Sequence, residues 1–347
     1  MSSRRTILQR TAKTNSTHAG LWLDKYLYER PETWTTPRND SNARSPDTLL
    51  VAQCSAIPEP VDYLRQFERW LETLYAMGIK PRLATVTGRL AIGLGNETVI
   101  ETGATFHQTY GVPIIRGSAL KGLASSYAHQ QLQKTVWAKG TDAHNTLFGT
   151  TSSAGFVTFF DALPQPDTWK LRPDVITVHH PDYYRGNGSP PADWDNPTPI
   201  SFLTVTGNFL IALHASDAPA WAEVGYGILG KALQEMGIGA KTSSGYGRMN
   251  LRANPMKRPF KLKKGAFIRA IVTKIVGGDV ELQLRDKFAK YLPKDKEIYI
   301  YMPHNQVGNR TYQVDSAAAC IIEEVDDEYE YVLTCRPATK EEKQQNA

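Results

Sequence analysis

The stretch Gly237-Ile238-Gly239-Ala240-Lys241-Thr242-Ser243-Ser244-Gly245-Tyr246-Gly247-Arg248 combines four glycines with small hydroxyl residues, one lysine and one arginine. Glycine lets backbone N–H groups approach a phosphate closely, hydroxyls add donors, and Lys241 and Arg248 supply positive charge. Tyr246 offers a ring on which a nucleobase can stack. A helix C-cap followed by a tight turn is the alternative. The pattern favours a phosphate-binding loop formed by Gly237, Gly239, Lys241, Thr242, Ser243, Gly245, Tyr246 and Arg248.

The residues around this loop predict an alternation of helices and strands. The spacing of apolar residues predicts helices over 61–77, 118–133 and 219–236, with Gly78 ending the first. Alternating and β-branched residues predict strands over 83–92, 155–163, 205–213 and 246–251. The order strand–helix–strand–strand–helix–strand is typical of an α+β, ferredoxin-like fold. A hairpin around 93–111 and a Pro-rich insertion over 164–199 are expected to interrupt it.

A second candidate site is the start of the helix over 118–133. The segment 110–122 runs from an extended apolar stretch into this helix and carries Arg116, Ser118 and Lys121. A helix N-terminus with basic neighbours attracts anions, so we predict that these three residues bind an anion, with Ser118 as the N-cap. Ser118 and Lys121 also fit the SxxK pair of acylating enzymes, but the companion motifs are missing.

The composition is that of a globular chain with a mild excess of positive charge. Lys and Arg number 40 against 35 Asp and Glu, which gives a net charge of +5 and is compatible with a polyanionic partner. Cys54, Cys320 and Cys335 are too far apart for a zinc cluster and indicate a reducing compartment. The sequence shows neither the apolar core of a signal peptide nor a long apolar run. We expect a cytoplasmic protein without a membrane partner.

Catalytic and metal-binding patterns are weak. The segment 225–232 matches GxxxxGK but has Ala232 where a P-loop needs Ser or Thr. The histidines show no metal-ligand spacing, and no carboxylate pair marks Asp161 or Asp174 as an acid–base group. For the adjacent His179 and His180, a packing role is favoured over acid–base chemistry. We therefore expect no metal, no cofactor, no small-molecule substrate and no catalytic residue.

Composition divides the chain into four parts. These are a basic flexible arm and irregular segment over 1–60, the α+β domain over 61–254, a β-rich domain over 255–338 and a charged tail over 339–347. Five short β-patterned runs between 266 and 335 favour a small barrel, of the oligonucleotide/oligosaccharide-binding (OB) kind.

The β-rich domain begins with seven basic residues between Lys257 and Lys274. They could extend a nucleic-acid track, protect a solvated strand edge or dock a partner. The stacking candidates for the first role are Phe260, Phe267, Tyr299 and Tyr301. The acidic residues between Glu323 and Glu330 predict a solvated turn that nucleic acid avoids.

The two anion-binding motifs together resemble the repeat-associated mysterious protein (RAMP) superfamily of CRISPR effector complexes. The segment 113–122 is similar to the superfamily's P-x-I-P-G-S-S-L-K-G helix entry, and 237–248 is similar to its loop, usually close to G-x-G-x-K-T-x-x-G-Y-G-R. Intervening pieces such as Leu147-Phe148-Gly149 and Asp161-Ala162 also fit. Over residues 61–252 the combination is similar to the sixth subunit of type III-B (Cmr) complexes.

The resemblance implies a ferredoxin-like domain that binds the 3′-terminal part of the CRISPR RNA (crRNA) and caps a backbone of related subunits. It implies crRNA, target RNA and other RAMP-type subunits as partners. Because target cleavage in these complexes is attributed to a neighbouring subunit, it also implies a non-catalytic role. The alternative is a metal-independent endoribonuclease that processes CRISPR RNA precursors with His179, His180 and Tyr183. A structural spacer without RNA contact is a third possibility.

Overall fold

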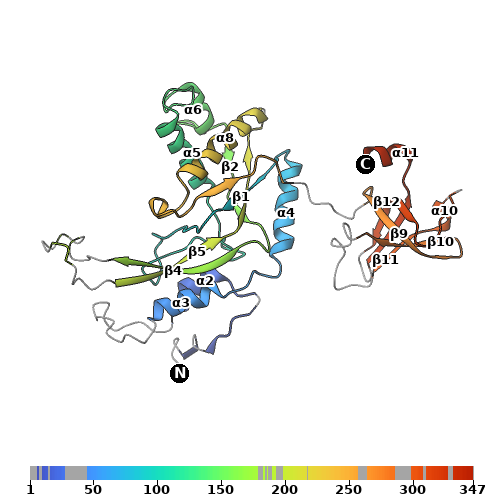
Figure 1. Cartoon of the computed structure of the whole chain (residues 1–347), viewed down its shortest axis with the longest axis horizontal. Helices are drawn as coiled ribbons and strands as arrows, with labels where there is room; N and C mark the ends of the chain where they lie inside the picture. Colours follow the sequence, from blue (N-terminus) through green and yellow to red (C-terminus); the bar gives the residue numbers. More distant parts are fainter. Residues whose placement is uncertain are drawn as a thin grey trace. The chain divides into compact units, whose positions relative to one another are not determined.

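The structure is a computed structural model that separates into two compact units, Met1–Arg258 and Pro259–Ala347 (Figure 1). It describes residues 6–7, 10–14, 16–27, 45–178, 183, 186, 190–192, 198–216, 218–256, 264–285, 298–307, 310–326 and 331–346. The first unit mixes helices and sheets, and the second is a β-barrel with short helices. The predicted α+β class with a β-rich C-terminal part is therefore confirmed.

A four-stranded sheet forms the centre of the first unit. Its strand order is β3 (Leu163–Pro164), β6 (Asn208–Ile211), β1 (Arg82–Val86) and β8 (Met249–Leu251), and each strand is antiparallel to its neighbours. Helices α5 (Gly117–Gln131) and α8 (Pro219–Glu235) pack side by side (Figure 1). This sheet and these helices share one apolar core.

Helix α4 (Tyr63–Ala76) confirms the helix predicted over 61–77. It ends in a Schellman motif, in which the N–H of Ile79 donates to the carbonyl of Leu74 and the N–H of Gly78 to that of Tyr75. Gly78 has a φ of +75°, the left-handed conformation that this motif requires. A local signal therefore predicted both the helix and its end.

The N-terminal segment differs from the prediction. Helices α2 (Ala19–Lys25) and α3 (Pro46–Ser55) lie within residues expected to be a flexible arm and an irregular connection. They bury Trp22, Leu23 and Leu50 in the core of the first unit. These short helices are held by tertiary packing, which overrides weak local preference.

The insertion expected over 164–199 also contains regular structure in its described part. Strands β4 (Lys170–Val178) and β5 (Thr198–Thr206) form a two-stranded antiparallel ribbon, against which α3 packs. The strand predicted over 205–213 is divided between β5 and β6 by Gly207, which has a φ of +120°. A Cβ atom there would lie 2.5 Å from the carbonyl oxygen of Thr168, so only glycine fits this bend.

The first unit contains further differences in detail. β1 is shorter than the strand predicted over 83–92, and residues 93–111 form turns and an isolated bridge, Phe106 with Pro113, rather than a hairpin. The strand predicted over 155–163 is split into β2 (Thr158–Phe159), which pairs with β7 (Leu213–His214), and β3. An unpredicted helix, α6 (Asp142–Phe148), precedes them. No helix in the described ranges has both the length and the apolar character of a membrane span.

The second unit is a closed barrel of five strands, in the order β10-β11-β13-β12-β9. The strands are β9 (Phe267–Val276), β10 (Asp279–Leu284), β11 (Ile298–Met302), β12 (Ala317–Asp326) and β13 (Tyr331–Pro337). β11 and β13 are parallel, the other neighbours are antiparallel, and α10 (His304–Val307) lies between β11 and β12 in the chain. This barrel is compatible with the predicted OB-like domain.

The charged tail expected over 339–347 contains a helix, α11 (Lys340–Gln345). Thr339 and Glu342 form a capping box at its start. Arg336 pairs with Glu342 (Nη2 to Oε1, 2.7 Å) and with Glu323 (Nε to Oε1, 2.5 Å). The helix is thus fixed to β13, and one residue of the predicted acidic turn takes part in its attachment.

We expect Tyr226→Phe to lower the free energy of unfolding by about 1–3 kcal/mol. The buried hydroxyl of Tyr226 accepts from the N–H of Leu213 (3.0 Å) and donates to the carbonyl of Ile211 (3.3 Å). Burial raises the pKa of Tyr226 to about 12, so the hydroxyl stays protonated at neutral pH. The variant leaves a buried N–H group without its acceptor. Urea denaturation measures the effect.

Tyr110→Phe is the matched control, because the half-buried hydroxyl of Tyr110 donates to the side chain of Gln66, which water can replace. We expect a loss below about 0.5 kcal/mol for this variant. Equal losses for the two variants would contradict the role assigned to Tyr226.

Candidate nucleic-acid interface

Four glycines with positive φ shape the glycine-rich loop, residues 237–248, which follows α8. Gly237, Gly239, Gly245 and Gly247 have φ values between +74° and +87°. At Gly239 a Cβ atom would lie 2.2 Å from the carbonyl oxygen of Ala91, and at Gly247 it would lie 1.9 Å from that of Ile238. Both neighbours are backbone atoms, which cannot move aside as a side chain can. Glycine is therefore required twice for close backbone approach.

Backbone hydrogen bonds fix the loop to the segment that leaves β1. The N–H of Ala240 donates to the carbonyl of Ala91 (2.8 Å), and the N–H of Gly247 donates to that of Arg89 (2.8 Å). The N–H of Thr87 in turn donates to the carbonyl of Arg248 (3.0 Å). With these bonds the loop is a rigid extension of the sheet rather than an open turn.

Lys241, Thr242 and Ser243 form the tip of the loop. Lys241 is left-handed (φ +59°), and Thr242–Ser244 form one turn of 3-10 helix. Among the residues that the structure describes, no acceptor binds the backbone N–H groups of these three residues, and the Lys241 ammonium forms no ion pair. Successive free N–H groups at a left-handed residue make an anion-binding nest. The predicted phosphate-binding residues at the tip thus lie together with their donors available.

The side chain of Arg248, by contrast, forms hydrogen bonds within the protein. Its guanidinium donates to the carbonyl oxygen of Gln234 (2.8 Å) and also to that of Glu235. These are the last carbonyls of α8, which have no partner within the helix. Arg248 therefore caps this helix, and its predicted contact with nucleic acid remains a prediction.

Tyr246 is held by a carboxylate from the β4–β5 ribbon. Its hydroxyl donates to Asp174 Oδ2 (2.9 Å), and the same oxygen accepts from Arg89 Nη1 (2.8 Å). The ring lies 6.0 Å from that of Phe202. Burial and the bond to Asp174 raise the pKa of Tyr246. Asp174, which the sequence left without a role, thus joins the loop to the ribbon.

The second predicted site, at the start of α5, differs from the expectation. The helix begins at Gly117 with Arg116 as the N-cap, so Ser118 is not the N-cap. Asp161 Oδ1 accepts from the N–H of Gly117 (2.7 Å), and Oδ2 pairs with Arg116 Nη1 (3.3 Å). A carboxylate of the protein therefore already occupies this helix terminus. Ser118 is exposed and Lys121 is half-buried.

The structure does not bring the two predicted sites together. Near the end of α5, Tyr127 donates to Glu235 Oε2 at the end of α8 (2.9 Å), so the C-terminal ends of the two helices meet. The loop follows that end of α8. Gly117 lies ten residues before Tyr127, which is about 15 Å along the helix axis. The loop and the Arg116 terminus are thus separate sites.

Several other sequence predictions fall outside the described residues. His179 and His180 lie there, as do Phe260 and four of the seven basic residues that open the second unit. Lys264, Arg269 and Lys274 are described, and the Arg269 guanidinium lies 6.0 Å from the ring centre of Phe267. The predicted extension of the RNA track into the barrel stays a prediction.

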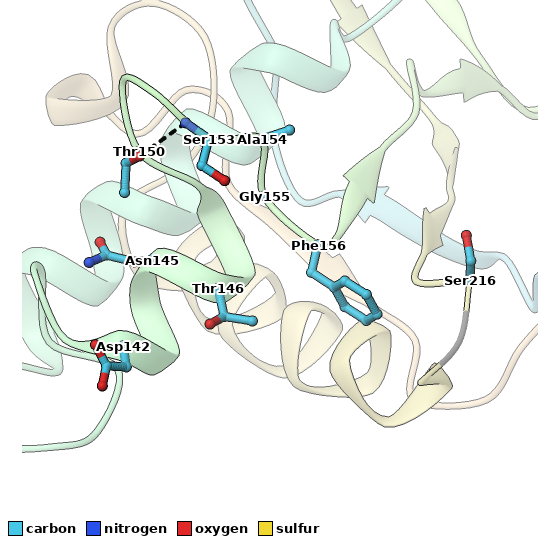
Figure 2. A pocket seen from close by; sticks show the side chains of 9 residues that line it. All are labelled: Asp142, Asn145, Thr146, Thr150, Ser153, Ala154, Gly155, Phe156 and Ser216. Atoms are coloured by element: carbon cyan, nitrogen blue, oxygen red, sulfur yellow. Dashed lines mark hydrogen bonds between the residues drawn. The ribbon is translucent and has the colours of Figure 1, made fainter.

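A polar pocket of about 630 Å³ lies between α6 and the loop that follows it (Figure 2). Among its described lining residues Asp142 is the one charged residue, and the others are polar, small or aromatic. Figure 2 shows the backbone of Ser153 bonded to the hydroxyl of Thr150, and Phe156 near Ser216. With a carboxylate and no cation, this pocket does not suit a phosphate group.

Comparison with known proteins agrees with the predicted resemblance. The sequence model of the RAMP superfamily matches residues 82–250, which include both predicted sites. The "CRISPR system Cmr subunit Cmr6" of Pyrococcus furiosus is 30% identical over 246 residues, covering 54% of this chain and 71% of that protein. The chain belongs to the RAMP superfamily. The Cmr6 subunit of Saccharolobus solfataricus is 28% identical to this RAMP protein over 182 residues, covering 48% and 56% of the two chains.

Solved structures also show partial similarity to this RAMP protein. A chain of the type III-B Cmr-beta complex bound to cognate target RNA aligns with a TM-score of 0.45 and 23% identity, covering 59% of this chain and 72% of that one. The crystal structure of Cmr6 from Pyrococcus furiosus aligns with a TM-score of 0.34 and 28% identity, covering 50% and 98%.

We expect Gly247→Ala to destabilise this RAMP protein by roughly 3 kcal/mol or more, because the added Cβ meets the Ile238 carbonyl. Gly245→Ala is the matched control, since Gly245 has a φ of +87° but open space around it. For Gly245→Ala, the left-handed backbone conformation alone should lower the free energy of unfolding by about 1–2 kcal/mol. Thermal and urea denaturation distinguish the two variants, and equal losses would contradict the close-approach argument.

Proposed function

We propose that the chain is a non-catalytic, crRNA-binding subunit of a type III (Cmr-type) CRISPR ribonucleoprotein. In this proposal it caps the backbone of RAMP-type subunits near the 3′ end of the crRNA, in the cytoplasm. The observation that carries the proposal is the tip of the glycine-rich loop, where, among the described residues, three N–H groups have no acceptor and one lysine has no ion pair. Such a group of donors binds phosphate oxygens without reading the base sequence.

The relatives support the assembly part of the proposal. Both curated relatives are named as Cmr6 subunits of the CRISPR Cmr system. The region that matches the RAMP superfamily contains the loop and the start of α5. The proposed partners are accordingly crRNA, target RNA and other subunits of the same complex.

The topology of the first unit supports a ferredoxin-like fold as part of the proposal. The sheet is antiparallel in the order β3-β6-β1-β8, with α5 between β1 and β3 in the chain and α8 between β6 and β8. This is the arrangement of two interleaved βαβ units. Loops that connect such elements lie at the surface of the domain and commonly carry binding residues, as the glycine-rich loop does in this proposal.

The surroundings of Asp161 and Asp174, the two carboxylates considered as acid–base groups, support a non-catalytic role. Asp161 binds the start of α5 and Arg116, and Asp174 binds Tyr246 and Arg89. Both side chains are thus engaged in holding an RNA-binding element in position. A processing endoribonuclease would be supported instead by cleavage of repeat RNA by the purified chain in EDTA.

We expect Lys241→Ala to weaken binding of single-stranded RNA and to reduce the slope of log affinity against log salt by about 0.7, the contribution of one phosphate contact. Fluorescence anisotropy at several salt concentrations measures this slope. An unchanged slope would show that the Lys241 side chain does not contact an RNA phosphate.

Two control variants sharpen this test. Lys80→Ala removes an exposed lysine just before β1, at the opposite end of that strand from the loop, and should leave the slope unchanged. Arg248→Ala should instead lower the thermal stability, because it uncaps the last carbonyls of α8. A normal melting temperature for Arg248→Ala would show that its capping bonds contribute little.

A further inference from the structure

A second pocket, of about 450 Å³, opens beside the start of α5 and is rich in aromatic side chains. Its aromatic lining comes from α4, from the turn before the helix entry, from β2 and from the chain that follows β2. The residues that matter here are Trp70, His107, Tyr110, Phe159, Phe160 and Asp161. The polar pocket of Figure 2, by comparison, has one aromatic residue in its lining.

The rings are held in place before any ligand arrives. His107 and Tyr110 stack with centroids 4.5 Å apart and planes inclined by 18°, and Trp70 meets Phe160 edge-on at 5.6 Å. The Tyr110 hydroxyl donates to Gln66. These side chains are half-buried, so each leaves part of its aromatic surface uncovered at the cavity. Preformed aromatic pockets with a few polar groups are typical ligand sites.

The polar groups at this pocket are of two kinds. Gln66 and Asp161 offer oxygens that can accept hydrogen bonds from a heterocycle edge. Arg116 pairs with Asp161 while its side chain stays 51% exposed, so a cation stands at the rim. Burial and the nearby Arg116 lower the pKa of His107, which keeps its ring neutral at pH 7. Flat ring faces and acceptors match the face and the edge of a nucleobase, and the rim cation matches its phosphate.

We propose that this pocket holds one unstacked nucleobase of a bound single-stranded RNA, with the adjoining phosphate on Arg116. The inference rests on the proposed function, which brings RNA to the protein, and adds a base-stacking site distinct from the glycine-rich loop. Proteins that bind single strands stack successive bases on aromatic side chains, and any base has a face suited to this. The volume is within the range of small-ligand pockets.

The test combines protein variants with abasic RNA. With the full chain and a short single-stranded RNA, Tyr110→Leu should lower affinity about 5- to 150-fold, the effect of losing one base–aromatic stack. Tyr110→Phe keeps the ring and should bind like the wild type. Phe156→Leu removes an exposed aromatic ring outside the pocket and should change nothing. Trp70→Leu provides a second variant if Tyr110→Leu unfolds.

A double-mutant cycle then separates this pocket from other contacts. An RNA with one abasic position in register with the pocket should bind the wild type more weakly by a similar factor. The Tyr110→Leu variant should bind the abasic and the intact RNA with equal affinity. Cross-linking of 4-thiouridine RNA should mark peptides that contain Trp70, Tyr110 or Phe160.

The outcomes that would overturn the inference differ from those that would overturn the proposed function. If the wild type binds RNA and Lys241→Ala weakens it, but Tyr110→Leu and Trp70→Leu bind normally, the pocket takes no base and the function stands. Loss of a partner subunit without loss of RNA affinity would show that the pocket receives a protein side chain instead. If the wild type fails to bind single-stranded RNA, the proposed function and this inference both fall.

Discussion

The contact between the glycine-rich loop and the segment that leaves β1 is the constraint on which the candidate interface depends. Gly239 lies against the carbonyl of Ala91, and Gly247 lies against that of Ile238, at distances that leave no room for a Cβ atom. Once this backbone is fixed, Lys241 is placed in the left-handed conformation at the tip. Within the described part of the chain, the N–H groups of residues 241–243 have no acceptor. Those of residues 244–246 donate to carbonyls of the loop itself, and those of Ala240 and Gly247 donate to the segment that leaves β1.

Local signals predicted the elements that depend on local physics. Gly78 ends α4 because the Schellman motif needs a left-handed residue, and Pro219 begins α8 where a missing N–H is tolerated. In β10, alternate residues are buried, so a period of two was visible in the sequence. The glycine-rich loop was predictable for the same reason, since its glycines are required by its own backbone conformation.

The features that the sequence did not reveal depend on partners far along the chain. Most of the β4–β5 ribbon falls within the expected Pro-rich insertion, for which no strands were predicted, yet Pro173 and Pro199 are tolerated where both strands are edges. Asp161 bonds Gly117 across 44 residues, and Asp174 bonds Tyr246 across 72. Nothing in the local sequence of either aspartate indicates such a bond. The sequence therefore indicated both candidate motifs, but neither the carboxylates that hold them nor the distance between them.

That distance constrains how a single strand could use both motifs. The meeting of Tyr127 with Glu235 keeps the start of α5 about 15 Å from the loop end of α8. A single strand that contacts both motifs must therefore span about 15 Å. One phosphate cannot touch both motifs, so their contributions combine only through a strand long enough to span them. In the proposed binding mode, the loop would act through charge and weaken as salt rises, whereas stacking at the aromatic pocket would not depend on counterion release. Affinity at low salt would then be dominated by the loop, and the share of the pocket would grow as salt increases.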